Sequence, residues 1–355
     1  YDDVAAAFKD YRTYSSTSGL DLAMVRSDSP PPKIILFMDP PEHRRMRSLV
    51  SKAFTPRAIR SLRDTVIDLV RRYLKNADPR RFDVMQEFSG PFPVDVITRM
   101  LGVPEELSQQ VRTWFDDGMG QEPGRMEKSE TAVQALAEAA AYFLGLVQER
   151  RAQPRNDMIS TLIAAEVERA DDEATRLEDH EIVLFAMMLA AAGTETVAKL
   201  IGSAVAVSAQ NPKQWQKLLD DRSKIPAAVD EVLRYDGPVL YNVRCTTKEV
   251  AVGGVTIPAD KPVLLCLASA NRDSAAFTEA DTFDVERDRG QPQHLGFGGG
   301  IHSCLGAALA RMETAIALEH LLDFMPRYEV IWQDCKRVTP TSVAGWQHLP
   351  VRVLQ

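Results

Sequence analysis

The sequence has little cysteine and no uninterrupted apolar run of the length that crosses a membrane. Its cysteines, Cys245, Cys266, Cys304 and Cys335, are spaced 21, 38 and 31 residues apart, which matches no zinc-binding pattern. A few scattered thiols in a large chain fit the reducing cytoplasm better than an oxidising compartment. The nearest apolar candidate, 182–192, is much shorter than the roughly 20 residues of a membrane-spanning helix. These absences predict a cytoplasmic protein without a membrane span.

A basic charge field is also absent, because the formal net charge of the 355 residues is −8. Proteins that bind nucleic acid usually carry a basic surface, so we expect no nucleic-acid partner. With 45% hydrophobic and 26% charged residues, the composition is that of an ordinary globular protein and excludes a disordered or fibrous chain. No signal peptide is visible, but Tyr1 is not an initiator methionine, so we expect further residues before it.

Apolar residues recur at helical spacing through the first two-thirds of the chain. This pattern predicts helices over 64–74, 129–151, 156–168 and 179–209. The last of them ends before an Asn-Pro pair at 211–212, which is a helix stop signal. It would be about 45 Å long, enough to cross a whole domain. A helix of this length and apolar character is expected to be central.

The last third of the chain has the signals of short strands. A Gly-Gly turn predicts a hairpin over 250–257, a further strand is expected over 263–267, and 328–332 can pair with 351–354. The predicted fold class is therefore mainly α (α+β), a helix-rich domain with a long central helix and small sheets. Because no clean linker or internal repeat is found, we expect one domain over residues 1–355.

The densest chemical signal is a glycine-rich loop that carries a cysteine and leads into a helix. It contains Phe297, Gly298, His302, Cys304 and Gly306. Glycine permits backbone conformations that other residues avoid, and a loop ending at a helix N-terminus points several N–H groups at one place. A thiolate there is stabilised by these donors, which suits a metal ligand or a nucleophile. The alternative is a buried structural cysteine, and no motif supplies an activating base for a nucleophile.

The order F-x-x-G-x-H-x-C-x-G resembles the haem-ligand loop of the cytochrome P450 family. The resemblance implies the cytochrome P450 fold and haem b, iron protoporphyrin IX, as the cofactor. It implies that Cys304 is the axial ligand of the haem iron and that the other four residues of this loop contact the haem. The related segments reach from about Asp39 to Gly306.

A second signal lies in the middle of the long predicted helix, where the sequence reads Ala192-Gly193-Thr194-Glu195-Thr196. An interior glycine costs roughly 1 kcal/mol in a helix, and a charged residue in an apolar stretch is costly unless it is used. The alternative is a purely structural one, a local bend of the helix with Glu195 at the surface. The resemblance implies instead the family's oxygen site, with Glu195 as the acid and Thr196 as the alcohol that relay protons to dioxygen.

Basic residues that could hold the two carboxylates of a haem occur in two further segments. His43 and Arg47 are four residues apart and so share one helical face, although a solvated basic face would look the same. The resemblance includes their segment, D-P-P-E-H-x-x-x-R, and assigns both side chains to the propionates. It assigns Arg244 and His302 to the same carboxylates.

A charged pair at Glu231 and Arg234 lies on one face of a predicted helix, a spacing that is common on protein surfaces. The resemblance makes this the family's E-x-x-R pair, with Arg287 as its third member. It implies that the three residues form a buried structural network behind the cysteine loop.

The substrate pocket is predicted against the Thr196 side of the long helix. Helical and strand periodicity name the lining residues Met188, Ala191 and Ala192 on the helix and Val239, Leu240 and Asn242 on the segment that enters Arg244. Core packing alone would explain these residues as well. Apolar walls with one amide suggest a hydrophobic small molecule held by one polar group.

The resemblance thus implies a haem-dependent monooxygenase that inserts one atom of dioxygen into a hydrophobic small molecule. The sequence has no dinucleotide-binding loop and no iron–sulfur spacing, so a separate ferredoxin with its reductase, or a flavodoxin, is expected to donate electrons. A peroxide-driven peroxygenase and a non-catalytic haem-thiolate sensor or carrier are the alternatives. Neither of them needs the pair formed by Glu195 and Thr196.

Overall fold

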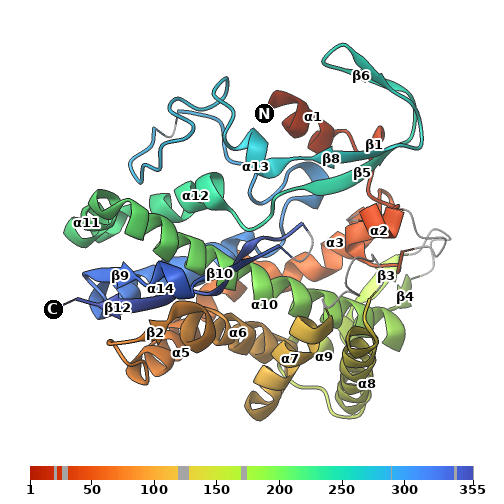
Figure 1. Cartoon of the computed structure of the whole chain (residues 1–355). Helices are drawn as coiled ribbons and strands as arrows, with labels where there is room; N and C mark the ends of the chain where they lie inside the picture. Colours follow the sequence, from red (N-terminus) through yellow and green to blue (C-terminus); the bar gives the residue numbers. More distant parts are fainter. Residues whose placement is uncertain are drawn as a thin grey trace.

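Helices dominate the computed structural model, which describes residues 1–19, 22–25, 31–118, 128–168, 174–288, 290–339 and 342–354 (Figure 1). The α-helices in this part of the chain are α1 (Asp2–Lys9), α2 (Leu22–Val25), α3 (Glu42–Val50), α4 (Pro56–Ser61), α5 (Arg63–Lys75), α6 (Pro91–Leu101), α7 (Ser108–Gly118), α8 (Glu130–Ala152), α9 (Met158–Ala164), α10 (Asp179–Gln210), α11 (Pro212–Asp220), α12 (Ile225–Asp236), α13 (Leu267–Ala270) and α14 (Ala307–Phe324). The predicted helix-rich fold class is confirmed.

Short 3-10 and π turns connect several of these helices. They are η1 (Ile35–Phe37), η2 (Ser51–Phe54), η3 (Val84–Ser89, a π turn), η4 (Glu105–Leu107), η5 (Arg222–Lys224), η6 (Gly300–His302) and η7 (Trp332–Asp334). The turn η6 belongs to the cysteine loop. It ends just before Cys304, so its geometry helps to place that residue.

The strands are short and form small antiparallel sheets. They are β1 (Tyr14–Ser15), β2 (Phe82–Asp83), β3 (Glu166–Glu168), β4 (Ala174–Arg176), β5 (Asn242–Thr246), β6 (Val250–Val252), β7 (Val255–Ile257), β8 (Pro262–Leu265), β9 (Tyr328–Val330), β10 (Lys336–Val338), β11 (Gly345–His348) and β12 (Pro350–Val353). The described sheets have the orders β1-β5-β8 and β2-β12-β9, with the pairs β3-β4, β6-β7 and β10-β11. The hairpin β6-β7 and the pairing of β9 with β12 confirm two of the strand predictions. The strand predicted over 263–267 is shorter than expected, because β8 ends at Leu265 and Leu267 begins α13.

The long helix α10 crosses the middle of the molecule (Figure 1). At its N-terminus, Glu178 and Glu181 form a capping box in which the Glu181 carboxylate accepts the backbone N–H of Glu178 at 2.8 Å. Its first half packs into a core with α6, α8 and α9, and its second half into a core with α5, α12 and α14. Both cores therefore fix the position of this helix, as its sequence predicts.

Composition and length alone would let α10 cross a membrane, although half of its most apolar window is buried inside the structure. The sequence analysis considered only the uninterrupted apolar run 182–192 and therefore did not identify α10 as long and apolar enough to span a membrane. The mean hydropathy of a longer window identifies it, because averaging tolerates isolated polar residues. The core helix of a globular protein meets the same criterion, and the packing of α10 in both cores accounts for its composition.

The helix predicted over 156–168 is shorter than expected. Asp157 caps α9 by accepting the N–H of Ser160 at 2.8 Å, and the helix ends at Ala164 because Ala165 has an extended backbone. The segment Glu166–Glu168 then pairs with β4 as the strand β3. The prediction of one continuous helix there is wrong, since backbone pairing with a later segment takes over after Ala165.

Candidate haem site

A cavity of about 300 Å³ lies between α10 and the cysteine loop. The side chains of α10 that line it are Met188, Leu189, Ala192, Gly193, Thr196, Val197 and Leu200, and the cysteine loop contributes Phe297, Gly298, His302, Cys304 and Gly306. Further walls come from α3, from β5 and from the first turns of α14. All eight residues predicted to hold haem line this one cavity, which we call the haem cavity: His43, Arg47, Arg244, Phe297, Gly298, His302, Cys304 and Gly306.

Backbone contacts within the cysteine loop bring Cys304 back toward its start. The N–H of Cys304 donates to the carbonyl oxygen of Phe297 at 3.0 Å, and the N–H of Gly298 donates to Leu295 at 2.8 Å. Gly300 has a φ of 61°, and a Cβ atom there would lie 2.0 Å from the carbonyl oxygen of Phe8. Only glycine fits this left-handed position against α1, which explains part of the glycine pattern.

The Cys304 side chain faces the haem cavity, and its accessible surface lies there. Burial among protein atoms raises the pKa of the Cys304 thiol above its ordinary value. The backbone N–H groups of Gly306 and Ala307 and the guanidinium groups of Arg47 and Arg311 act in the opposite direction. These donors and cations are what a thiolate requires, because they stabilise the charged form of the sulfur.

At another part of the wall, four nitrogen-bearing side chains gather with few partners. His43 is only 2% exposed, and neither of its ring nitrogens has a hydrogen-bond partner among the described residues. Its ring lies 4.4 Å from that of His302, whose Nε2 is also without a partner in that part of the chain. The side chains of Arg47 and Arg244 donate only to the backbone carbonyls of Ile301, at 3.4 Å, and Val243, at 2.8 Å, in the described structure. We call these four residues the donor cluster.

The protonation of the donor cluster follows from its burial. Desolvation lowers the pKa of His43 and, with the charge of Arg244 added, lowers the pKa of His302 to about 3. Both imidazoles are therefore neutral near pH 7. His43 keeps a free N–H to donate, whereas His302 also has a hydrogen bond to the backbone of Met38. Burial also lowers the pKa of Arg244, and the charge of Asp39 acts against this shift.

The residues of the cavity fit a haem. Buried donors without acceptors are costly, and two carboxylates on a bound ligand would satisfy those of the donor cluster. The remaining wall is mostly apolar, as a porphyrin ring requires, and Cys304 presents a sulfur to the same space.

The acid and the alcohol predicted as one pair face different cavities. Thr196 lines the haem cavity and donates its hydroxyl to the carbonyl oxygen of Ala192 at 2.8 Å. Glu195 instead lines a second cavity of about 550 Å³, where its carboxylate lies 2.9 Å from the ammonium group of Lys199. Consecutive helical residues diverge by about 100°, so adjacency in sequence does not place both side chains on one face.

The second cavity is bounded by charged residues from α7 and α10. Arg112 and Asp116 of α7 line it with Glu195 and Lys199, and Arg112 contacts Asp116 at 3.3 Å. Burial raises the pKa of Glu195, while the charge of Lys199 lowers it. The net result is a pKa of Glu195 above that of an exposed glutamate.

Only some of the residues predicted to form the substrate pocket line the haem cavity. Met188, Ala192, Val239 and Asn242 line the haem cavity, whereas Ala191 and Leu240 do not. The strand β5 begins at Asn242, so its alternation does not extend to Leu240, whose backbone carbonyl accepts the N–H of Ala268 at 3.0 Å. Ala191 lies one helical step from Ala192 and points away from the lining.

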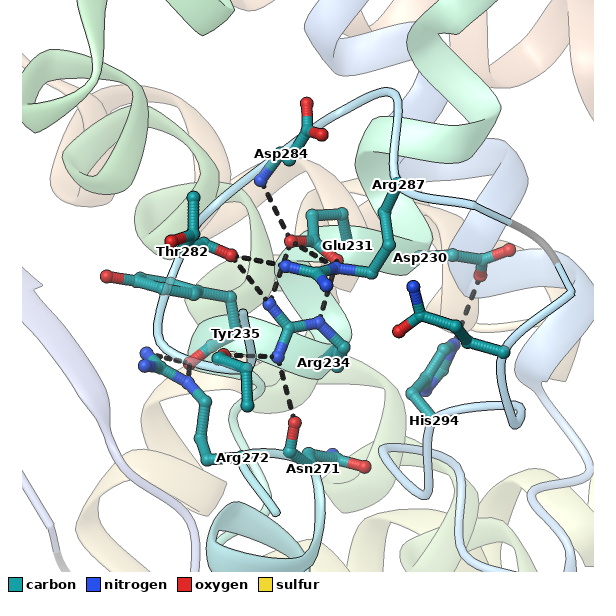
Figure 2. Close-up of polar contacts among 12 residues, drawn as sticks. Asp230, Glu231, Arg234, Tyr235, Asn271, Arg272, Thr282, Asp284, Arg287 and His294 are labelled. Carbon is teal, nitrogen blue, oxygen red and sulfur yellow. Dashed lines mark hydrogen bonds and ion pairs between the residues drawn. The ribbon is translucent and has the colours of Figure 1, made fainter. Parts of the chain in front are cut away.

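The third predicted group forms a closed network. Both carboxylate oxygens of Glu231 accept from Arg234 at 2.8 Å and from Arg287 at 3.0–3.1 Å, and one of them also accepts the N–H of Asp284 (Figure 2). Arg234 donates further to the backbone carbonyls of Asn271 at 2.9 Å and Thr282 at 2.9 Å. We call Glu231, Arg234 and Arg287 the scaffold network.

The scaffold network is connected to the cysteine loop through Asn271. The backbone carbonyl of Asn271 accepts from Arg234, and its side-chain oxygen accepts the N–H of Leu295 at 2.7 Å. Leu295 in turn accepts the N–H of Gly298. The network therefore supports the start of the cysteine loop without lining the haem cavity.

Phe8 and Glu313 are among the lining residues that sequence reasoning did not name. Phe8 comes from α1, far from every motif, and its ring lies 5.7 Å from the Arg244 guanidinium. Glu313 lies on α14 between Leu309 and Ile316, at the spacing of that helix's buried apolar face. An acid at an apolar position of a helix was a signal that could have found Glu313.

A long helix that crosses a glycine-rich cysteine loop, with an apolar cavity between them, is the arrangement of a haem-thiolate enzyme. The chain belongs to the cytochrome P450 family, because the sequence model of the family described as Cytochrome P450 matches its residues 123–334. The erythromycin C-12 hydroxylase of Saccharopolyspora erythraea is 37% identical over 353 residues, which cover 98% of this chain and 87% of that protein. The protein is therefore a haem-dependent cytochrome P450 monooxygenase.

Further relatives agree with this assignment. The biotin biosynthesis cytochrome P450 of Bacillus subtilis is 36% identical over 340 residues, covering 92% of this chain and 82% of that protein. A solved structure of a P450 EryK mutant in complex with erythromycin B superposes with a TM-score of 0.89 at 36% identity. It covers 99% of this chain and 89% of the other.

Proposed function

We propose that this chain binds haem b with Cys304 as the axial ligand of the iron and hydroxylates a hydrophobic small molecule. The observation that carries the proposal is the convergence of Cys304 and the donor cluster on one cavity. Cys304 is the one cysteine among the lining residues, which suits a haem held by ligation and carboxylate contacts. Bound there, haem supplies the binding and cleavage of dioxygen.

The side chains of this cavity have separate tasks in the proposal. The guanidinium groups of Arg47 and Arg244 and the neutral imidazoles of His43 and His302 hold the two propionates by charge-assisted hydrogen bonds. The Thr196 hydroxyl, which lines the haem cavity, would hold a proton for the reaction of dioxygen. Glu195 takes up and releases protons on the side of the second cavity. Its ion pair with Lys199 holds the carboxylate on that side.

We propose an apolar substrate that lies between α10 and β5. Met188, Ala192 and Val239 provide apolar walls, and Asn242 provides one amide that can orient a polar group. The similarity to an erythromycin C-12 hydroxylase supports molecules like erythromycin as one candidate class. Replacement of Ala192 by Phe should block substrate binding while carbon monoxide still binds. Unchanged substrate affinity in Ala192→Phe would place the substrate elsewhere.

Electrons are proposed to come from a separate ferredoxin with its reductase, or from a flavodoxin, in the cytoplasm. The free cysteines of the structure suit a reducing compartment. A peroxygenase or a non-catalytic sensor would have no need of the Thr196 hydroxyl at the haem cavity. Consumption of NADH with surrogate redox partners, oxygen and a substrate distinguishes the monooxygenase from both. We also propose that residues 1–355 act as one domain.

The test of the haem assignment is Cys304→Ala, with Cys335→Ala as the matched control. The first variant should lose the thiolate-type spectrum of the reduced carbon monoxide complex, because no other cysteine lines the cavity in the described structure. The second should keep it, since Cys335 is not a lining residue. A thiolate spectrum in Cys304→Ala would show that another cysteine is the ligand.

A further inference from the structure

His294 is a buried polar residue in the segment that leads into the cysteine loop, and neither the donor cluster nor the scaffold network contains it. It is 9% exposed, and its Nδ1 atom accepts the backbone N–H of Gly296 at 3.1 Å. Its Nε2 atom lies 3.3 Å from Oδ1 of Asp230 on α12 (Figure 2). Because an amide N–H can only donate, the ring proton is on Nε2 and is donated to Asp230. The two contacts therefore fix one tautomer of His294.

The same oxygen of Asp230 also accepts a hydrogen bond from Arg311 of α14, at 2.7 Å. The Arg311 guanidinium lies over the ring of Phe297, 4.6 Å from its centroid, and the His294 ring lies 5.8 Å from the Phe297 ring. A cation over an aromatic face is attracted to it. One carboxylate of α12 thus connects the start of the cysteine loop with α14, and both of its partners flank Phe297. We call Asp230, His294 and Arg311 the loop clamp.

Phe297 connects the loop clamp with Cys304. The carbonyl oxygen of Phe297 accepts the N–H of Cys304 at 3.0 Å, so the position of Phe297 helps to set the backbone around the sulfur. None of the three clamp residues lines the haem cavity. They can therefore act on a ligand in that cavity only through the loop and through their charges.

The charges of the loop clamp also act on Cys304. Burial raises the pKa of the Cys304 thiol, and the guanidinium of Arg311 is among the groups that act against this rise. Burial opposes the ionisation of Asp230, but the hydrogen bonds from His294 and Arg311 outweigh it and lower the pKa of its carboxyl. Arg311 is therefore a cation near the sulfur, and Asp230 is an anion that offsets part of its field.

We propose that the loop clamp is a set of positioning residues that adjusts the reduction potential of a haem bound at Cys304. The Arg311 charge favours the reduced state, which carries one more electron, and the Asp230 carboxylate moderates this effect. His294 fixes the backbone at Gly296, so that the loop keeps its place beside the Arg311 cation. This role rests on the proposed ligation of haem by Cys304.

Redox titration of the haem-bound protein tests the charges. Arg311→Gln should lower the reduction potential and Asp230→Asn should raise it, because the first removes a positive charge and the second a negative one. Arg311→Lys keeps the charge and should stay closer to the parent potential. Arg311 is half-buried, so the shifts should shrink as salt is added, which an effect of packing would not do. Arg222→Gln, which breaks an ion pair with Asp323 at the far end of α14, is the control and should keep the parent potential.

Amide hydrogen exchange tests the position of the loop without haem. His294→Leu leaves the N–H of Gly296 without its acceptor, so exchange in 294–298 should become several-fold faster. His294→Asn should restore part of the protection, because an Asn side chain can accept an N–H two residues along the chain. His180→Leu, at an exposed site on α10, is the control and should leave the exchange unchanged. Parent-like exchange in His294→Leu would refute the role of His294.

The potentials decide the proposal as a whole. A parent-like potential in Arg311→Gln, or shifts of the same sign in Arg311→Gln and Asp230→Asn, would overturn it while haem ligation by Cys304 stands. If Asp230→Asn does not retain haem, the comparison of Arg311→Gln with Arg311→Lys decides. A parent protein that binds no haem would contradict the proposed function and, with it, this inference.

Discussion

Two buried clusters of polar and charged residues flank the cysteine loop, and they differ in whether the chain itself supplies their hydrogen-bond and ion-pair partners. In the scaffold network, the carboxylate of Glu231 is shared by Arg234 and Arg287, and the remaining guanidinium N–H groups reach backbone carbonyls (Figure 2). In the donor cluster, both nitrogens of His43 and one of His302 have no partner within the described structure. The first cluster is complete within the chain, whereas the second requires a ligand.

This difference separates a structural role from a binding role where sequence alone does not. Both clusters contain charged or basic pairs at helical spacing, His43 with Arg47 and Glu231 with Arg234, and both pairs look like surface charges in the sequence. Because desolvated charges are tolerated only when paired, the unpaired cluster marks the place where an anionic ligand belongs. The comparison leads to four predictions, given from the largest expected effect to the smallest.

Removing the shared acid should damage the fold itself. Glu231→Gln leaves two buried guanidinium groups without their carboxylate, and breaking a buried ion pair in this way costs about 3–5 kcal/mol of unfolding free energy. Chemical denaturation of the protein without haem measures this loss. Glu286→Gln is the control, because its ion pairs with Lys217 and Lys224 are more exposed and should change stability much less. Equal stability of both variants would mean that the network is not structural.

Removing a member of the donor cluster should leave the fold intact and weaken haem retention. Arg244→Leu replaces a buried, unpaired cation by an apolar side chain, so the protein without haem should be as stable as the parent or more stable. Haem transfer to an acceptor protein should become faster, with the thiolate spectrum unchanged. Arg44→Leu on the exposed side of α3 is the control and should lose haem at the parent rate. A stability loss in Arg244→Leu as large as that in Glu231→Gln would contradict the assignment of a structural role to the scaffold network alone.

On α10, the two cavities predict two different defects. Thr196→Ala should still bind haem and consume NADH with a bound substrate, but should release more peroxide and less product, because its hydroxyl lines the haem cavity. Glu195→Gln should mainly slow turnover and increase the solvent isotope effect, because Glu195 faces the other cavity with Lys199. Quantifying product, peroxide and NADH measures both. Identical defects would indicate that the two residues act as one unit.

The smallest effect is a change in pH dependence. The pKa of His302 is lowered to about 3 in the folded protein, so below its ordinary value of 6.5 the unfolded chain takes up a proton that the folded chain does not. Without haem, stability is therefore lost as the pH falls from 6.5 toward 3. His302→Asn should reduce this loss by no more than about 1.4 kcal/mol per pH unit. Denaturant unfolding at pH 7 and pH 5 checks this, and an unchanged pH dependence would contradict it.

Local patterns predicted a large part of this structure. The cysteine loop, the spacing of His43 and Arg47 on α3, and the pair Glu231 and Arg234 on α12 are short-range features, so their periodicity survives in the fold. The hairpin β6-β7 is confirmed for the same reason, because its Gly-Gly turn fixes its register. The residues predicted to hold haem line one cavity, to which α3, β5 and the cysteine loop all contribute.

The parts that sequence reasoning did not give depend on contacts between distant segments. Glu195 faces the second cavity because Arg112 and Asp116 of α7 and Lys199 enclose its carboxylate there, and no local pattern contains α7. Leu240 lies outside the haem cavity because β5 begins two residues later than alternation suggested. Glu313 is buried by the packing of α14 against α10, which turns an ordinary helical glutamate into an unsatisfied acid.

The close approach of α1 to the cysteine loop has a consequence for biosynthesis. The carbonyl oxygen of Phe8 lies where a Cβ atom of residue 300 would be, so these two segments can only be fitted together after both exist. These segments are separated by about 290 residues, and a ribosome adds roughly 5–20 residues per second. The cysteine loop is therefore synthesised about 15–60 s after α1. During that time the apolar face of α1 is open to chaperones. The haem pocket is therefore among the last parts of the molecule that can close during translation.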